Sequence, residues 1–125
     1  MAAVLQNQKS ILIVEDDVAI RDALTLILKD EGYAVVGAPN GLEALRHLKE
    51  NGPPDLIVLD LMMPIMDGWQ FSKEQQQDPS LKDVPVVVLS ANGNVGQKAN
   101  LLGAVGFLQK PVEVTDLLEV IQRCC

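Results

Sequence analysis

Residues 55–68 read Asp-Leu-Ile-Val-Leu-Asp-Leu-Met-Met-Pro-Ile-Met-Asp-Gly, and this stretch decides the fold. The apolar run Leu56–Leu59 predicts a strand covered on both faces, as at the centre of a parallel sheet. Asp60 follows directly, and Pro64 and then Asp67-Gly68 indicate a turn that leads into a helix. A carboxylate after a buried strand either caps a turn or helix, as many Asp residues do, or has a chemical role. This stretch alone leaves both readings open.

Strand-like and helix-like segments alternate on both sides of this stretch. The predicted strands are residues 11–14, 33–36, 56–59, 86–89 and 105–109. Apolar residues at helical spacing predict five helices after these strands. A weak pattern predicts the third helix, from about 68 to 76, and Gly32 ends the first. The apolar stripes of the other four are Ile20, Ala23, Leu24, Ile27 and Leu28; Gly41, Ala44, Leu45 and Leu48; Val95, Ala99 and Leu102; and Val114, Leu117, Leu118 and Ile121. Strict alternation requires a parallel sheet with helices on both faces. We predict one doubly wound α/β domain over residues 9–125, with five parallel strands in the order 2-1-3-4-5, five helices and a polar lead-in over residues 1–8.

Composition narrows the class of protein. The chain has 125 residues, enough for one domain with a proper core, and a formal net charge of −7. Such a surface repels nucleic acid and anionic membranes, so we expect neither as a direct partner. No apolar run approaches the roughly 20 residues that span a bilayer, and the first residues do not resemble a secretory signal. The adjacent Cys124 and Cys125 cannot link distant segments, and reduced thiols fit a cytoplasmic location.

Polar residues follow four of the predicted strands. Glu15 and Asp16 follow the first, Asp60 the third, Ser90 the fourth and Lys110 the fifth. The carboxyl ends of parallel strands meet at one edge of the sheet, so three carboxylates are expected to converge there. Charges about 4 Å apart repel by roughly 4 kcal/mol at an effective dielectric constant near 20. One lysine cannot neutralise three carboxylates, which predicts a hard divalent cation, Mg²⁺ before Ca²⁺.

This set of residues predicts phosphoryl transfer. Asp60 is the candidate nucleophile, because a carboxylate beside Mg²⁺, a lysine and a hydroxyl is equipped to receive a phosphoryl group. Lys110 and Mg²⁺ would neutralise charge on the transferring oxygens, and Ser90 would donate a hydrogen bond to one of them. No single piece is specific, whereas the set in this order at these strand ends is.

The sequence resembles the receiver domain of two-component response regulators over about residues 9–123. The resemblance rests on residues 55–68 and on Ile-Leu-Ile-Val-Glu-Asp-Asp (11–17), Pro-Val-Val-Val-Leu-Ser-Ala (85–91) and Gly-Phe-Leu-Gln-Lys-Pro (106–111). It implies a flavodoxin-like fold and makes Asp60 the phosphoacceptor, with a histidine kinase or a histidine phosphotransfer protein as donor. It also implies that Glu15 and Asp16 bind Mg²⁺, Asp16 more directly, together with the backbone carbonyl of Met62.

The same resemblance implies a switch. Ser90 matches the switch hydroxyl, Phe107 the switch aromatic and Lys110 the family's lysine. Phosphorylation, which adds about −1.5 to −2 charges, is then expected to draw Ser90 and Phe107 inward. That movement would repack the face made of the fourth predicted helix, the fifth strand and the last helix. A signalling module follows, rather than an enzyme acting on other substrates. It is a monomer or a phosphorylation-dependent dimer, and its downstream target or effector domain is unknown.

Four positions qualify this resemblance. Glu15 stands where the family more often has Asp, and its reach to the metal could run through water. Phe107 often appears as Tyr, and Phe has no hydroxyl, so its inward movement would be apolar packing alone. Met62 and Asn92 occupy the positions that tune phosphate lifetime in the family, but the lifetime itself does not follow from them.

Several residues also have plainer interpretations. Asp17 is expected to cap the first helix rather than bind metal. Phe107 fits ordinary packing at least as well as a switch. The only histidine, His47, lies off its helix's apolar stripe and is expected to be solvated. Trp69 and the methionines at 62, 63 and 66 are expected to pack rather than to form a cofactor site.

Three other functions compete with the receiver interpretation. An FMN site would need a phosphate-binding loop after the first strand, where this chain has acids. A Mg²⁺-dependent phosphatase with Asp60 as nucleophile usually needs a second acid two residues later, where this chain has Met62, and a cap for which it has no room. A pseudo-receiver that only binds partners would not need Asp60, Ser90 and Lys110 together.

Overall fold

The computed structural model describes residues 8–91 and 93–125. Asn92 and residues 1–7 of the predicted lead-in therefore lie outside the described residues. The described strands are β1 (Ser10–Val14), β2 (Ala34–Ala38), β3 (Leu56–Asp60), β4 (Val86–Ser90) and β5 (Gly106–Gln109). The described helices are α2 (Val18–Asp30), α3 (Gly41–Asn51), α4 (Gly68–Gln77), α5 (Val95–Leu102) and α6 (Val114–Cys124).

The strands form one parallel sheet in the order β2-β1-β3-β4-β5, which confirms the predicted topology. The order reverses between β1 and β3, whose register pairs Val14 with Leu59. On the other side of β3, Asp60 pairs with Leu89, so Ser90 lies one residue further along β4. The carboxyl ends of β1, β3 and β4 therefore meet at one edge of the sheet, beside the topological switch point.

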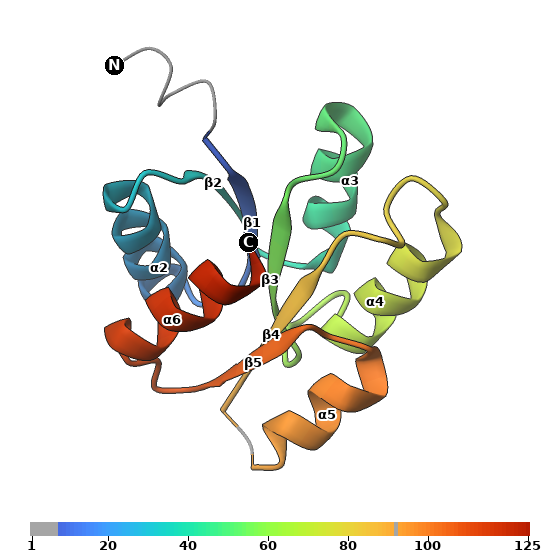
Figure 1. Cartoon of the computed structure of the whole chain (residues 1–125). Coiled ribbons are helices and arrows are strands. Elements are labelled where there is room, and N and C mark those ends of the chain that lie inside the picture. Colours follow the sequence, from blue (N-terminus) through green and yellow to red (C-terminus); the bar gives the residue numbers. More distant parts are fainter. Residues whose placement is uncertain (1–7, 92) are drawn as a thin grey trace.

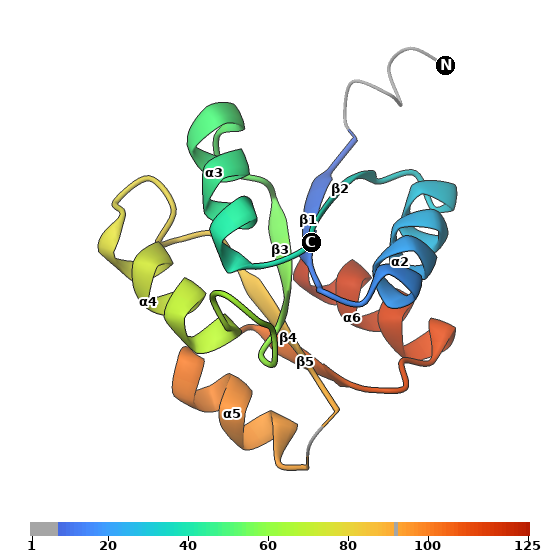
Figure 2. The same ribbon diagram turned by 180° about the vertical axis from the view of Figure 1, so that it is seen from behind.

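Helices cover both faces of the sheet, as Figures 1 and 2 show: α2 and α6 lie on one face, and α3, α4 and α5 lie on the other. Alternate residues of β3 serve the two layers, because successive side chains in a strand point to opposite faces. Leu56 and Val58 pack with α2 and α6, and Ile57 and Leu59 pack with α3 and α4. Every residue of β3 is buried. Asp60 therefore ends the most deeply enclosed strand of the protein's core.

Side-chain caps fix where three of the helices begin. Asp17 accepts a hydrogen bond from the Ile20 amide, which confirms its predicted role as the cap of α2. Asn40 caps α3 in the same way. Asp67 and Gln70 form a reciprocal capping box at the start of α4, directly after the loop that follows Asp60. These caps hold the strand-to-helix loops at the edge where the polar residues gather.

The edges of the fold differ from the sequence-based expectation. The second strand was expected at 33–36, but β2 spans Ala34–Ala38, because the Tyr33 amide still bonds to Leu28 O and closes the end of α2. Ala23 and Val114 were expected in apolar stripes and are exposed, whereas Val120 of α6 is buried. β2 is an edge strand, and α6 covers the sheet near its other edge, so burial there depends on tertiary packing that short-range patterns do not encode.

Among residues 8–91 and 93–125, none of the helices combines the length and the apolar character that crossing a bilayer requires.

Candidate functional site

Glu15 follows β1 and is held by both its backbone groups. Its amide donates to Ala38 O of β2 at 3.0 Å, and its carbonyl accepts from Arg21 Nη1 at 2.8 Å. The side chain is fully buried, and Oε2 accepts a hydrogen bond from the Asp17 amide at 3.2 Å. Asp16, the next residue, is exposed. The β1–α2 loop thus directs one acid into the protein and leaves its neighbour at the surface.

Asp60 lies at the end of β3 and is only 1% exposed. Its Oδ1 accepts a hydrogen bond from the Met62 amide at 3.1 Å, which ties the carboxylate to the loop that follows. Gly68, the first residue of α4, lies so close that a Cβ there would meet Asp60 O at 2.6 Å and Leu61 Cα at 2.7 Å. The absence of a side chain at position 68 therefore lets the start of α4 press against the backbone of Asp60.

Lys110 follows β5 and reaches back to both buried acids. Its amide donates to Ser90 O at 2.9 Å, and the Lys110–Pro111 peptide bond is cis. Its Nζ lies 2.6 Å from Glu15 Oε1 and 3.2 Å from Asp60 Oδ2, with 17% of the side chain exposed. One ammonium group thus contacts two carboxylates that come from different strands.

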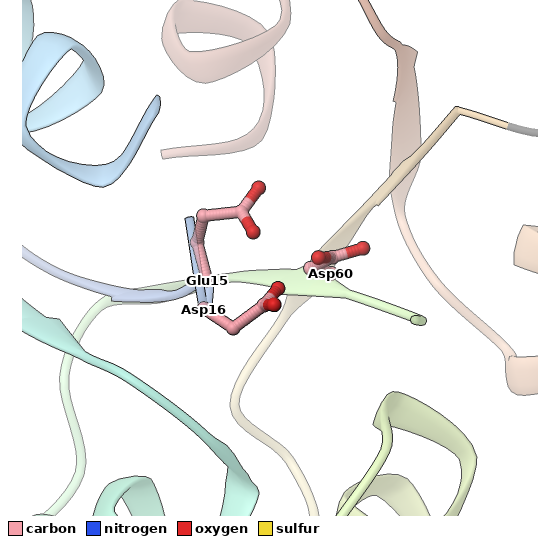
Figure 3. Close-up of side chains that lie close together, drawn as sticks. All are labelled: Glu15, Asp16 and Asp60. Carbon is pink, nitrogen blue, oxygen red and sulfur yellow. The ribbon is translucent and has the colours of Figure 1, made fainter. Parts of the chain in front are cut away.

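Glu15, Asp16 and Asp60 form an acidic cluster, shown in Figure 3. Each offers one carboxylate oxygen, and these oxygens all lie within 4.8 Å of one another. Glu15 and Asp60 are buried and Asp16 is exposed, so the cluster opens to solvent on the side of Asp16.

The acids and the lysine shift one another's protonation. Burial, reinforced by a hydrogen bond with Asp60, raises the pKa of Glu15 to about 7, while Lys110 and the Asp17 amide oppose that rise. Burial alone would lower the pKa of Lys110, but its hydrogen bond to Glu15 and the charge of Asp60 leave it raised. Near neutral pH the buried Glu15 carboxyl therefore still retains part of its proton, despite its contact with Lys110.

The chemistry of these donors fits a hard divalent cation. Mg²⁺ and Ca²⁺ prefer carboxylate, carbonyl and water oxygens, and Mg²⁺ commonly keeps several waters. The three carboxylate oxygens supply such donors within one small volume, with solvent access beside Asp16. Burial is the largest cause of the raised Glu15 pKa, and the charge of Asp60 adds a smaller contribution that a cation would offset.

The structure also places the other residues that the sequence analysis singled out. Ser90 is fully buried at the end of β4, next to the strand that carries Asp60. Phe107 of β5 is 49% exposed and lies beside α5, where a Cβ on Gly96 would be 3.3 Å from its ring.

The expected packing of two apolar residues is wrong. Met62 is 62% exposed and Trp69 is 38% exposed, whereas Met63 is buried as expected. His47 is half-buried and lies 3.1 Å from the Asn51 amide nitrogen.

Arg21 was missed by the sequence reasoning. It lies on α2 and contacts Glu15 through a backbone carbonyl, so neither helical spacing nor a motif indicates the contact. Only the path of the β1–α2 loop brings the two residues together.

Comparison with known proteins identifies the family. The family model described as "Response regulator receiver domain" matches residues 11–122. The chain therefore belongs to the response regulator receiver domains, which act as phosphoacceptors in two-component signalling. This confirms the resemblance drawn from the motifs, and the five-stranded architecture agrees with it.

The named relatives include one of similar length and two that are much longer than this chain. An uncharacterized 14.6 kDa protein of Leptolyngbya boryana is 37% identical over 120 residues, covering 94% of this chain and 91% of its own. Response regulator MprA of Mycobacterium sp. (strain KMS) is 39% identical over 110 residues, covering 86% of this chain and 46% of its own. The DNA-binding dual master transcriptional regulator RpaA of Synechocystis is 37% identical, covering 86% and 45%. The chain thus spans less than half the length of these two regulators.

Solved structures give the same family. The chemotaxis protein CheY4 of Vibrio cholerae superposes with a TM-score of 0.86 at 32% identity, covering 94% of this chain and 99% of that one. The signal receiver domain of a histidine kinase from Syntrophus aciditrophicus gives a TM-score of 0.82 at 33% identity, covering 93% and 89%. Receiver domains of similar fold therefore occur both in a chemotaxis protein and within a kinase.

Proposed function

We propose that Asp60 is the phosphoacceptor of this receiver domain and that it takes its phosphoryl group from a phosphohistidine of a histidine kinase or a histidine phosphotransfer protein. The observation that carries this proposal is the position of Asp60 between the other charged groups. Its carboxylate shares Lys110 with Glu15 and lies in one cluster with Glu15 and Asp16. Among the described carboxylates, only Asp60 and Glu15 both belong to this cluster and contact Lys110, and Asp60 is the one that matches the phosphoacceptor position of the family.

Glu15, Asp16 and Asp60 would hold Mg²⁺ together with the backbone carbonyl of Met62. The exposed Asp16 offers a direct ligand that the cation reaches from solvent, and the buried Glu15 is oriented by Lys110 and the Asp17 amide. When bound, Mg²⁺ would supply positive charge to the oxygens of the transferring phosphoryl group. This role suits a cation that keeps part of its water shell.

The transfer itself exchanges one bond for another. A carboxylate oxygen of Asp60 attacks phosphorus, and the new O–P bond forms as the donor's N–P bond breaks. The electron pair of that bond stays on the imidazole nitrogen, which takes up a proton. Lys110 moves no proton in this step: its ammonium stabilises negative charge on the phosphoryl oxygens, and Ser90 donates a hydrogen bond to one of them.

Ser90 and Phe107 are proposed to report the phosphorylation to the surface. Ser90 is the last residue of β4, which lies between β3, the strand that ends at Asp60, and β5. Phe107 lies half-exposed on β5 beside α5. Movement of Ser90 toward a phosphorylated Asp60 would leave space toward which Phe107 can turn. The surface made of α5, β5 and α6 would then bind a downstream partner, an output domain or a second copy of the chain.

This proposal makes the protein a cytoplasmic signalling module that catalyses only its own phosphorylation and dephosphorylation. The loop after Asp60 argues against a phosphatase that acts on other substrates. The residue two beyond Asp60 is the exposed Met62, whose thioether cannot serve as a general acid.

Intact-mass measurement after treatment with a small acyl phosphate donor tests the proposal. The wild-type protein should gain one phosphoryl group in Mg²⁺ and none in a chelator, and Asp60→Asn should gain none. Asp67→Asn is the matched control, because Asp67 lies in the same loop and Asn is an equally good helix cap. Equal labelling of Asp60→Asn and wild type would overturn the assignment.

A further inference from the structure

Arg21 bonds to the backbone of the β1–α2 loop, which carries Glu15 and Asp16. Its amide bonds to Asp17 O in the first turn of α2, and its Nη1 donates to Glu15 O at 2.8 Å. Glu15 follows the last residue of β1. The guanidinium therefore gives this carbonyl a charged partner, a stronger kind of hydrogen bond than a neutral one.

The Arg21 side chain reaches that carbonyl by crossing Gly37 of β2. A Cβ at position 37 would lie 2.9 Å from Arg21 Cδ and 3.0 Å from Cγ, closer than carbon atoms approach one another without displacement. The backbone of Gly37 does not have a positive φ, so its conformation is one that other residues can adopt. The bare backbone at Gly37 thus serves to make room for the stem of Arg21.

Arg21 acts on the acids through the main chain. Its guanidinium is in none of the ion pairs found in the described part of the chain, and the causes of the raised Glu15 pKa do not include it. Its contact is with the peptide that joins Glu15 to Asp16. That peptide sets the directions in which the two neighbouring carboxylates leave the backbone.

We propose that Arg21, seated on Gly37, is a positioning residue that presents Glu15 and Asp16 to the divalent cation. This inference rests on the metal site of the proposed function and deepens it. The pair Arg21–Gly37 fixes the loop before the metal arrives, so less ordering of the loop accompanies binding. Residues that orient metal ligands without touching the metal typically account for about 10- to 100-fold in metal affinity.

The first test is Mg²⁺ titration of Arg21→Met by calorimetry at a temperature where circular dichroism shows the variant folded. Methionine keeps an apolar stem over Gly37 and removes every hydrogen-bond donor. We expect the Mg²⁺ dissociation constant to rise by about tenfold or more. Arg46→Met is the matched control, because it removes the same charge from an exposed position on α3 and should leave the affinity unchanged.

The second test displaces Arg21 without altering it. Gly37→Ala should push the Arg21 stem away and weaken Mg²⁺ binding in the wild-type background. It should have no further effect in Arg21→Met, where the donor is already gone. A purely structural role would instead lower the unfolding midpoint of each variant and leave the dissociation constants equal.

The outcomes separate this inference from the proposed function. Wild-type affinity in both Arg21→Met and Gly37→Ala overturns the role of Arg21 and leaves the metal site standing. A wild-type protein that binds no Mg²⁺, or whose affinity is insensitive to Asp16→Asn, overturns the metal site and the positioning role together. Additive effects of Arg21→Met and Gly37→Ala would contradict the proposed path through Gly37.

Discussion

Lys110 Nζ lies 2.6 Å from Glu15 Oε1, an ion pair between residues at opposite ends of the chain. Glu15 is fully buried, and Lys110 also contacts Asp60 at 3.2 Å. A buried charge is tolerated only with a partner, and removing one member of such a pair typically costs about 3–5 kcal/mol. These contacts of Lys110 therefore stabilise Glu15 and Asp60 in their present positions.

Replacing Lys110 should impair phosphorylation of Asp60. In Lys110→Met the ammonium that faces both acids is lost, so charge on the transferring phosphoryl group has one stabilising contact fewer. We expect the labelling rate with a small acyl phosphate donor to fall by about 100-fold or more. Lys73→Met, on the exposed side of α4, is the control and should label at the wild-type rate. A Lys110→Met variant as fast as this control would contradict the role.

Glu15 should make the stability of the metal-free protein depend on pH. Its pKa is about 7 in the folded protein against an ordinary value of 4.5, so the folded state retains a proton that the unfolded state releases. The free energy of unfolding should therefore fall as pH rises from 4.5 to 7 and level off above that range. At about 1.4 kcal/mol per pKa unit, the contribution of Glu15 is up to about 3 kcal/mol.

Urea unfolding in a chelator from pH 4.5 to 8 measures this contribution, by comparison with Glu15→Gln. Asp16, Asp60 and Lys110 face Glu15 and remain in the variant, so the difference between the two profiles reports Glu15 itself. The wild-type protein should lose stability relative to Glu15→Gln over this range, and Mg²⁺ should restore it. Parallel profiles would show that the buried carboxyl does not retain its proton.

Asp16 and Asp17 should behave differently although they are adjacent. Asp16→Asn removes the exposed carboxylate proposed to bind the metal, so Mg²⁺ affinity should fall about tenfold or more while stability stays within about 0.5 kcal/mol. Asp17→Asn keeps the cap of α2, because Asn and Asp cap equally well, and should bind Mg²⁺ like wild type. Calorimetric titration of the two variants measures this contrast. Equal losses in both would place Asp17 among the ligands.

Gly68→Ala should lower the free energy of unfolding, because it adds a methyl group beside the backbone of Asp60. The added Cβ would meet backbone atoms of Asp60 and Leu61, which cannot turn aside as a side chain can. We expect a loss of about 1–3 kcal/mol in the free energy of unfolding, measured in urea. Gly93→Ala is the control, since a Cβ there meets nothing within 4 Å. A Gly68→Ala protein as stable as this control would show that α4 can shift away from Asp60.

The centre of the fold was predictable from sequence because its signals are local. Leu56–Leu59 is buried on both faces, and an unbroken apolar run is the direct consequence of that environment. The strand order then placed Glu15, Asp16 and Asp60 at one edge, and the structure brings their carboxylates together there. Sequence and topology therefore sufficed to predict that these acids converge.

Other features depend on packing between distant segments. β2 lies at the edge of the sheet with only Val35 and Ala38 buried, so its pattern did not show where it ends. Arg21 meets Glu15 only because Gly37 of a separate strand leaves space for its stem. The exposure of Met62 results from the path of the loop after Asp60, which the apolar character of methionine does not reveal.

The most direct test of the central claim is to find which residue carries the phosphoryl group. Borohydride reduces an aspartyl phosphate to homoserine, which peptide mass spectrometry then locates in the chain. After treatment with a small acyl phosphate donor in Mg²⁺, the account predicts homoserine at position 60 and none when the cation is chelated. Homoserine at another aspartate, or equal yield at position 60 without a divalent cation, would contradict it.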